Sequence, residues 1–463
     1  MNVSSTTSTT SSTKTSVLEQ DTTASTTNID VDHDDDHNDE DEEINEHTAV
    51  GTGMSEALTN FLQNKPQEFL DFLKENAIPL DSYDVTSLPR FIRVNTRLVT
   101  NEDEWRTKLE EQLHTKLISL PWLPNFYRLQ DQVGIASSKA YKNGEIYGMD
   151  ASSGAAVLAL DPQPGDNVLD ICCAPGTKLS LISDVMKGQG TVTGVDISMQ
   201  RLASCKTVLK KYKIPNARLF QCDASTFDIK APIPNDPIPF GRDQLNKKKQ
   251  RMTATAGELS STTNKDNDNG DNNNDNNDND DKSSTSTSTS TSVLGKRKNV
   301  SKKSTKRATY DLAGLYFCNT FHMRYSNAQL YDRVIVDAEC SLDASVRHLL
   351  LHRKLGRNFI PAELTELTNL QKRLIETGFR MLKVGGTLVY STCSFCRVQN
   401  EDVVQWLLDQ HPTIARLMPC FQVDANHQAV VPFSPGHIPN TYRFYPKNGT
   451  SGMFISKFTK VDG

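Results

Sequence analysis

The chain has 463 residues, of which 36% are hydrophobic, and a formal net charge of −6 at pH 7. This apolar share is low for a single globule, so part of the chain is predicted to lie outside any folded core. No apolar run is long enough to span a bilayer, and the polar N-terminus lacks a signal-peptide core, so we expect neither a membrane nor a secreted protein. The first arginine is Arg90, which argues against a mitochondrial transit peptide. Nine cysteines without a secretion signal predict free thiols in a reducing compartment, the nucleus or the cytoplasm.

Two segments have compositions that are typical of disorder. Residues 1–53 are rich in Ser and Thr and then strongly acidic, and such a segment cannot bury enough apolar surface to fold. A second low-complexity segment, at about 236–310, contains runs of Asn/Asp and of Ser/Thr and ends in a basic cluster at 296–307. The basic cluster could be a nuclear signal or an RNA-contacting arm, and a solvated linker is the simpler interpretation.

Residues 54–146 are predicted to form a small α/β domain. Phe69, Phe72 and Leu73 fit one face of a helix, and residues 90–96 alternate as a strand does. Residues 102–113 are a second candidate helix, and residues 117–129 supply further strand-like material.

Residues 147–463 follow a strand–helix rhythm. Predicted strands at 167–171, 191–196 and 217–222 carry Asp170, Asp196 and Asp223 at their ends, 26 and 27 residues apart, which is the spacing of a doubly wound parallel sheet. Each flank of the low-complexity segment alone has too few strands for a covered sheet, so that segment is expected to interrupt one domain. The later predicted elements are a strand at 332–337, a helix at 363–383 closed by Gly385-Gly386, a strand at 387–391, a helix at 401–409 capped by Asn400, and strand-like segments near 428–433, 441–445 and 452–458.

The turn at 170–178, Asp-Ile-Cys-Cys-Ala-Pro-Gly-Thr-Lys, joins a predicted strand to a helix. Gly176 allows close backbone approach to a ligand, and the following helix offers a partly positive N-terminus. Asp196, at the end of the next strand, is placed to accept hydrogen bonds from ribose hydroxyls. Because the turn has a single glycine and no phosphate-loop pattern, a nucleoside is favoured over a pyrophosphate.

Two cysteines each follow the carboxyl end of a predicted strand, in Asp337-Ala338-Glu339-Cys340-Ser341 and in Tyr390-Ser391-Thr392-Cys393-Ser394. One such cysteine is usually inert packing, but two beside an aspartate and a nucleoside site favour catalysis. The Cys393-x-x-Cys396 pair has no second pair at zinc-site spacing, so zinc is not expected. The remaining cysteines at 205, 222, 318 and 420 are interpreted as core or incidental residues.

Together these motifs resemble the Nop/Sun family of RNA cytosine-C5 methyltransferases, which use S-adenosyl-L-methionine. Residues 170–178 match the family's Asp-x-Cys-Ala-Ala-Pro-Gly-Gly-Lys motif except at Cys173 and Thr177, and Ser391-Thr392-Cys393-Ser394 matches its sixth motif. Residues 89–96 and 144–153 resemble the family's small domain and entry segment. The resemblance implies a Rossmann-like class I methyltransferase sheet with helices on both faces, preceded by a small α/β RNA-binding domain.

The resemblance also implies roles for individual residues. Cys393 would add to C6 of the target cytosine, Cys340 would assist product release, and Asp337 would contact the ring nitrogen. The partner would be RNA, with tRNA slightly favoured over rRNA, and Arg90, Arg93 and Arg97 are further candidate RNA contacts. The residues that would bind S-adenosyl-L-methionine are Cys172, Cys173, Ala174, Pro175, Gly176, Thr177, Lys178, Asp196, Arg201, Asp223 and Asp337.

The sequence departs from the family pattern at the fourth motif. Glu339 stands where proline is usual, and Leu342-Asp343 replaces a glycine-rich continuation. A DNA cytosine methyltransferase is disfavoured because its nucleophile follows proline in this motif, and an amino methyltransferase would need a different motif. The remaining alternative is a non-catalytic RNA-binding or ribosome-assembly scaffold that keeps the methyltransferase fold.

Overall fold

A computed structural model describes residues 55–63, 65–85, 88–130, 133–232, 315–318, 329–346, 349, 359–421 and 431–463. These residues belong to one compact unit, Asp36–Gly463. The predicted tail at 1–53, the low-complexity segment at 236–310 and its basic cluster lie outside the described residues, so their predictions stay untested.

A small antiparallel sheet is formed by the N-terminal part of the described chain. Its strand order is β2 (Leu117–Ser119), β3 (Phe126–Leu129), β1 (Phe91–Val94) and β4 (Ile146–Gly148). Helices α3 (Glu102–Leu113) and α4 (Lys139–Asn143) accompany this sheet, and α1 (Glu56–Gln63), α2 (Gln67–Glu75) and the 3₁₀ turn η1 (Leu80–Tyr83) precede it.

Helix α3 has the predicted bounds because both of its ends carry local signals. The Asn101 side chain accepts a hydrogen bond from the Glu104 backbone N–H, and acidic residues fill the first turn. The helix ends at His114, which adopts a left-handed conformation with φ of 52°.

The second sheet has, within the described residues, ten strands in the order β12-β13-β14-β10-β9-β5-β6-β7-β8, with β11 also paired to β14. Strands β7, β6, β5, β9 and β10 run parallel, and the others join in antiparallel pairs. The bounds are β5 (Asn167–Ile171), β6 (Thr191–Asp196), β7 (Ala217–Gln221), β8 (Leu315–Cys318), β9 (Tyr331–Asp337), β10 (Leu382–Thr392), β11 (Ala415–Met418), β12 (Ser434–Pro435), β13 (Thr441–Phe444) and β14 (Met453–Lys460).

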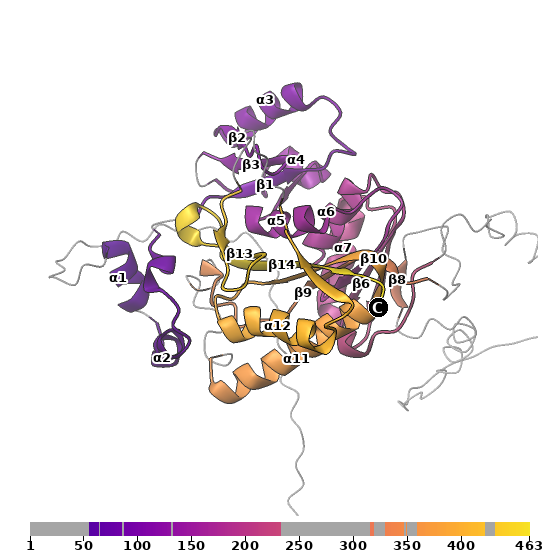
Figure 1. Cartoon of the computed structure of the whole chain (residues 1–463). Helices are drawn as coiled ribbons and strands as arrows, with labels where there is room; N and C mark the ends of the chain where they lie inside the picture. The colour runs from indigo at the N-terminus through magenta and orange to yellow at the C-terminus, as the bar shows by residue number, and fades with distance from the viewer. Residues whose placement is uncertain are drawn as a thin grey trace, which may run out of the picture. The chain divides into compact units, whose positions relative to one another are not determined.

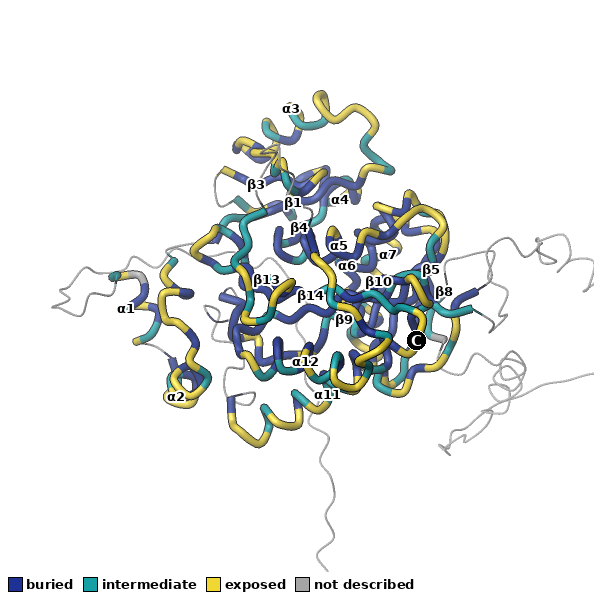
Figure 2. The backbone as a smooth tube through the Cα atoms, in the orientation of Figure 1, coloured by how far each residue is buried: buried dark blue, intermediate teal, exposed yellow. Residues whose placement is uncertain are grey.

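Helices cover both faces of this sheet, as Figure 1 shows. Successive strand residues alternate between two cores: Val168 packs with the helices of one face and Leu169 with those of the other. Figure 2 shows that the central strands are buried. One face carries α5 (Ala151–Leu160), α6 (Thr177–Val185) and α7 (Met199–Lys211), and the other carries α11 (Pro361–Met381) and α12 (Glu401–Gln410). The predicted Rossmann-like α/β class is confirmed.

Two sequence predictions near the end of the chain are wrong in detail. Gly385-Gly386 does not close the long helix: α11 ends at Met381, β10 begins at Leu382, and the glycines lie where the β9–β10 register shifts. Asn400 precedes α12, but its side chain makes no cap hydrogen bond. Its amide instead donates to the Ser394 carbonyl and its oxygen accepts from the Thr392 hydroxyl, so both polar atoms of the side chain are already bonded to the buried neighbouring loop.

Candidate functional site

The candidate site lies where the order of the parallel strands reverses. From β5 the chain proceeds outward to β6 and β7, and then returns to β9 and β10 on the other side of β5. The carboxyl ends of β5 and β9 therefore flank a crevice, which is where open parallel sheets bind ligands. Asp337 ends β9, and Cys393 directly follows β10.

The two cysteines predicted from sequence are brought together at this crevice. Cys340 Sγ lies 3.1 Å from Cys393 Sγ. Cys340 is 3% exposed, whereas Cys393 is a partly exposed residue. The hydrogen bond with Cys340, followed by burial, raises the pKa of Cys393 well above its ordinary value, so the thiol is protonated at neutral pH.

Asp337 and Lys178 form a partly buried ion pair next to these thiols. Lys178 Nζ lies 2.6 Å from Asp337 Oδ2, and the Ser391 hydroxyl donates to Asp337 Oδ1 at 2.7 Å. Burial lowers the pKa of Lys178, but the Asp337 carboxylate outweighs it and the net pKa is raised, so the side chain stays cationic. The Lys178 charge lowers the pKa of Cys393, in opposition to Cys340.

A buried hydrogen-bond network ties the two cysteine loops to each other. Gln399 accepts from the Ser341 backbone N–H at 3.0 Å and donates to the Ser341 and Ser394 hydroxyls at 2.7 and 3.1 Å. Asp343 accepts from the Phe395 N–H at 2.7 Å. These bonds join the residues that directly follow each thiol, so they fix where the thiols stand.

Asp196 closes the turn at 170–178 against the end of β6. Its carboxylate accepts backbone hydrogen bonds from Ala174 at 3.3 Å and from Ser198 at 2.9 Å. Arg201 lies 3.4 Å from Asp196 and donates to the Ala174 carbonyl at 2.9 Å. Gly176 has φ of +100°, and a Cβ there would stand 2.7 Å from Cys205 Sγ, so this position requires glycine.

The other predicted cofactor-site residues differ in exposure. Cys172 is partly exposed and Cys173 and Ala174 are buried, whereas Pro175 is exposed and Thr177, at the start of α6, is half-buried. Asp223 is exposed after β7, and its carboxylate accepts from the Ser225 N–H at 2.8 Å. The turn, Asp196 and Lys178 thus lie at the crevice, and Asp223 lies one strand further out.

Asp170 is a site residue that the predictions did not include. Neither carboxylate oxygen has a hydrogen-bond partner in the described structure, and the residue is buried. Burial, and then the negative charge of Asp337, raises the pKa of Asp170 well above its ordinary value. Its position as a strand-ending acid, like Asp196, is the signal that could have found it.

Arg93 is buried and not available to contact RNA, so the prediction is wrong for this residue, and Arg97 is bonded within the protein beside it. The Arg93 side chain is 1% exposed and pairs with Asp184 of α6, and it also donates to the Ser180 hydroxyl at 2.6 Å. Arg97 pairs with the same carboxylate at 2.7 Å and donates to the Tyr212 carbonyl at 2.9 Å. The two arginines hold the small sheet to α6 because Asp184 is a buried acid that needs their charge.

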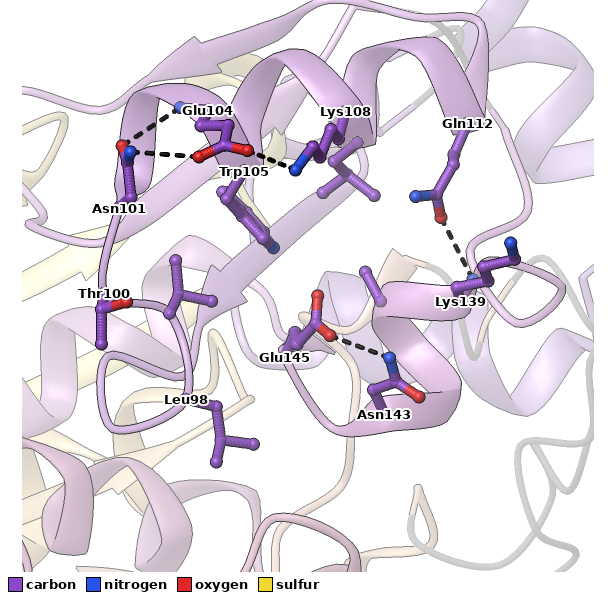
Figure 3. A pocket seen from close by; sticks show the side chains of 13 residues that line it. Leu98, Thr100, Asn101, Glu104, Trp105, Lys108, Gln112, Lys139, Asn143 and Glu145 are labelled. Atoms are coloured by element: carbon purple, nitrogen blue, oxygen red, sulfur yellow. Dashed lines mark hydrogen bonds and ion pairs between the residues drawn. The ribbon is translucent and has the colours of Figure 1, made fainter.

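A pocket of about 380 Å³ lies on the small domain, between α3, α4 and the preceding loops (Figure 3). Its polar groups bond one another: Glu104 pairs with Lys108, Gln112 accepts from the Lys139 N–H, and Asn143 donates to the residue before β4, Glu145. None of the predicted catalytic or cofactor residues lines it. The residues predicted from sequence for catalysis and cofactor binding lie instead on the large sheet and the loops and helices that follow its strands.

Comparison with known proteins identifies the family. A family model described as 16S rRNA methyltransferase RsmB/F matches residues 157–233 and 288–459, which is more than half of the chain. The chain belongs to this family. The relationship to RNA methyltransferases predicted from the motifs is confirmed, and so is the enzyme class.

Relatives of this RsmB/F chain differ in the RNA that their names specify. The chain is 25% identical over 376 residues to a tRNA (cytosine(49)-C(5))-methyltransferase of Pyrococcus abyssi. This match covers 80% of the chain and 87% of the relative. The chain is also 29% identical over 411 residues to a 28S rRNA (cytosine-C(5))-methyltransferase of Mus musculus. This match covers 85% of the chain and 66% of the relative. The chain spans about half the length of bacterial relatives such as the small-subunit rRNA methyltransferase F of Shigella dysenteriae. The two are 22% identical, and the match covers 76% of this chain and 55% of the relative.

A solved structure supports the fold of this RsmB/F chain. A methyltransferase homologue from Pyrococcus horikoshii superposes with a TM-score of 0.53 and 22% identity, covering 88% of this chain and all of the other. The predicted cofactor, S-adenosyl-L-methionine, is that of the family. The residues at the crevice fit this group, because Asp170 has an unpartnered buried carboxyl and Asp196 is an acid at the end of β6. No helix in the described part of the chain is long and apolar enough to cross a bilayer.

Proposed function

We propose that the chain methylates C5 of a cytosine in RNA and that Cys393 is the nucleophile. The observation that carries this proposal is the pair of thiols 3.1 Å apart beside the Asp337–Lys178 ion pair. A single thiol suffices to attack a base. A second thiol within contact distance is needed if another group is to help break the covalent bond between the first thiol and the base. The relatives named above, which act on cytosine C5 of tRNA and rRNA, support the same reaction.

In this mechanism the Cys393 thiolate adds to C6 of the cytosine, which makes C5 nucleophilic. Asp337 contacts the ring nitrogen and stabilises the charge that develops in the adduct. When bound, S-adenosyl-L-methionine supplies an electrophilic methyl group at the crevice. After C5 is methylated, its proton passes to the Cys340 sulfur, acting as a thiolate. The electrons of the C5–H bond restore the C5–C6 double bond and expel Cys393 from C6 as a thiolate.

We assign Lys178 a second role beside the cofactor contact expected from sequence. Its cation lowers the pKa of Cys393, while Cys340 raises it. Lys178 therefore favours the thiolate when the substrate arrives, and it also holds Asp337 in place through the 2.6 Å ion pair.

The turn at 172–178 would hold the methionine part of the cofactor. Asp196 would bind the ribose with help from Arg201, and Asp223 would contact the adenine edge. The buried backbone contacts of Asp196 support this assignment, because they orient its carboxylate at the strand end. Equilibrium binding of S-adenosyl-L-methionine to Asp196→Ala tests it, with loss of affinity expected.

The target cytosine must be unstacked to reach Cys393, so a loop or a locally opened stem is the substrate we propose. Transfer RNA is proposed ahead of ribosomal RNA, since the tRNA-specific relative is covered over 87% of its length. The small domain at 54–146 is proposed to bind the RNA, with Arg90 as a candidate contact. The nucleus or cytoplasm is the proposed compartment, because the two thiols must stay reduced.

The test is methyl transfer from labelled S-adenosyl-L-methionine to tRNA and rRNA pools, followed by nucleoside mass spectrometry. Labelled 5-methylcytidine should form with the wild type and not with Cys393→Ala. Cys420→Ala, which removes a buried cysteine outside the pair and the cofactor turn, is the control and should keep its activity. If the wild type binds both RNA and S-adenosyl-L-methionine but forms no 5-methylcytidine, the scaffold alternative replaces this proposal.

A further inference from the structure

The loop that carries Cys340 contains a residue in a conformation that its side chain disfavours. Leu342 has φ of 59°, in the left-handed region that glycine adopts freely and that costs energy for a leucine. Glycine is the ordinary solution at such a position. The leucine side chain must therefore be retained for a reason other than the path of the backbone.

Neighbouring hydrogen bonds hold this conformation in place. Ser341 is bound by Gln399, and Asp343 is bound to the Phe395 N–H on the other cysteine loop. The Ala344 N–H donates to the Cys393 carbonyl at 3.0 Å. With both sides of Leu342 fixed to the Cys393 loop, the strained residue cannot relax without separating the two loops.

The Leu342 side chain is exposed on a loop whose neighbouring residues are buried. It is 39% exposed, whereas Cys340, Ser341 and Asp343 are all buried. Two residues of chain span at most about 7 Å, so Leu342 lies within one base width of the Cys340 backbone. An exposed apolar side chain thus stands on the loop that carries Cys340, and this loop is bonded to Cys393 through the Ala344 N–H.

We propose that Leu342 is a substrate-contacting residue that packs against the unstacked pyrimidine entering the site. A base drawn out of its stack loses the apolar surfaces of its neighbours, and pockets for such bases replace them with apolar or aromatic side chains. The strain at Leu342 is then the cost of presenting that surface at a position where glycine would present none. This inference rests on the proposed function and adds a residue to it.

The experiment measures apparent KM for RNA, apparent KM for S-adenosyl-L-methionine and melting temperature in four variants. Leu342→Asn tolerates the left-handed conformation but removes the apolar surface, and Leu342→Gly removes both strain and side chain. Leu342→Met keeps an apolar surface. The control is Leu158→Asn on α5, since Leu158 is 38% exposed and matches Leu342 in exposure.

We expect apparent KM for RNA to rise about tenfold in Leu342→Asn and Leu342→Gly, with apparent KM for S-adenosyl-L-methionine within twofold of wild type and no fall in melting temperature. Leu342→Met and Leu158→Asn should stay near wild type. The proposal is overturned if Leu342→Gly binds RNA as the wild type does, if Leu342→Met is as impaired as Leu342→Asn, or if Leu158→Asn shows the same rise. Lack of 5-methylcytidine in the wild type would instead refute the proposed function, so the two failures are distinguishable.

Discussion

At the scale of single residues, the reactive thiol is placed between two opposing influences. Cys340 and burial raise the pKa of Cys393, and Lys178 lowers it. The protein thus keeps the thiol protonated at rest while holding a cation close enough to stabilise the thiolate. Each influence comes from one side chain, so each can be removed separately.

Removing Cys340 should lower the pKa of Cys393, and removing Lys178 should raise it. Iodoacetamide reacts with thiolates, so the alkylation rate of Cys393 increases as pH approaches its pKa. Compared with the wild type, this increase should occur at lower pH in Cys340→Ala and at higher pH in Lys178→Met. Mass spectrometry of the Cys393 peptide across a pH series measures both shifts. Shifts of the same sign in the two variants would contradict the opposing roles.

Asp170 should make the stability of the free protein depend on pH. Its folded pKa is raised above its unfolded value of about 3.9, so the folded state keeps a proton that the unfolded state loses. Its favourable contribution is complete below that unfolded pKa and falls as pH rises towards the folded one, by at most about 1.4 kcal/mol per pH unit.

Asp170→Asn removes this titration. In urea unfolding without cofactor, the stability of Asp170→Asn relative to wild type should increase between pH 4 and pH 7. The same variant should bind S-adenosyl-L-methionine more weakly, because the unpartnered carboxylate is then lost. A stability difference that stays constant with pH would show that Asp170 does not retain its proton.

The residue pairings at the crevice could be foreseen only in part. Asp337, Cys340 and Cys393 could be placed together, since the carboxyl ends of neighbouring parallel strands meet at one edge. The ion pair between Lys178 and Asp337 could not be foreseen, because it joins side chains 159 positions apart with no local signal.

At the scale of elements, the two cysteine loops act as one structure because Gln399 bonds to both. Gln399 is a positioning residue in this account, since it sets the separation of the thiols without touching the substrate. The Asn400 amide, which was expected to cap α12, serves the same loop by bonding to Ser394. The contacts of Asn400 therefore serve the loop that carries Cys393 and not the start of α12.

Gln399→Leu should slow the release of the RNA adduct more than its formation. Three buried hydrogen bonds to Ser341 and Ser394 are lost, so Cys340 no longer stands at contact distance from Cys393. We expect kcat to fall about tenfold or more, with KM for S-adenosyl-L-methionine unchanged and with adduct visible on denaturing gels.

The matched control is Gln405→Leu on α12, an exposed glutamine that bonds only to Asp409 in the described structure, and it should turn over normally. If kcat and adduct level in Gln399→Leu equal those of the wild type at a temperature where both are folded, Gln399 does not position the thiols.

Elements with local signals were predictable, and elements defined by distant partners were not. Helix α3 was predicted at its observed bounds, and the structure shows a cap and an acidic first turn at its start. Strands β8 and β12 are short, and their identity depends on pairing with β7 and β13. The α11–β10 boundary was misplaced because a helix passes directly into a strand there, and the glycine pair was interpreted as a stop.

At the scale of the whole molecule, buried charge joins the small sheet to the large one. Asp184 on α6 receives both Arg93 and Arg97 from the β1 region. Sequence alone favoured RNA for these arginines, because a basic side chain in a candidate RNA-binding domain gives no sign of a buried acid elsewhere. Burial is therefore what separates a structural arginine from an RNA contact here.

Arg93→Met should destabilise the fold by about 3 kcal/mol, since it leaves Asp184 buried with one of its two partners lost. Arg106→Met, which breaks a more exposed pair with Glu110, should cost about 1 kcal/mol or less. Denaturant unfolding measures both. An unchanged unfolding free energy in Arg93→Met, together with weaker RNA binding, would restore the RNA-contact interpretation.

The central claim is that two neighbouring thiols divide covalent attack and release between them. Its most direct test is to incubate Cys340→Ala with S-adenosyl-L-methionine and RNA, denature the protein, and map any attached nucleotide by mass spectrometry. The account predicts a stable adduct on Cys393 that carries a methylated cytosine, and no adduct with Cys393→Ala. An adduct on Cys340 in Cys393→Ala, or full turnover without Cys393, would contradict it.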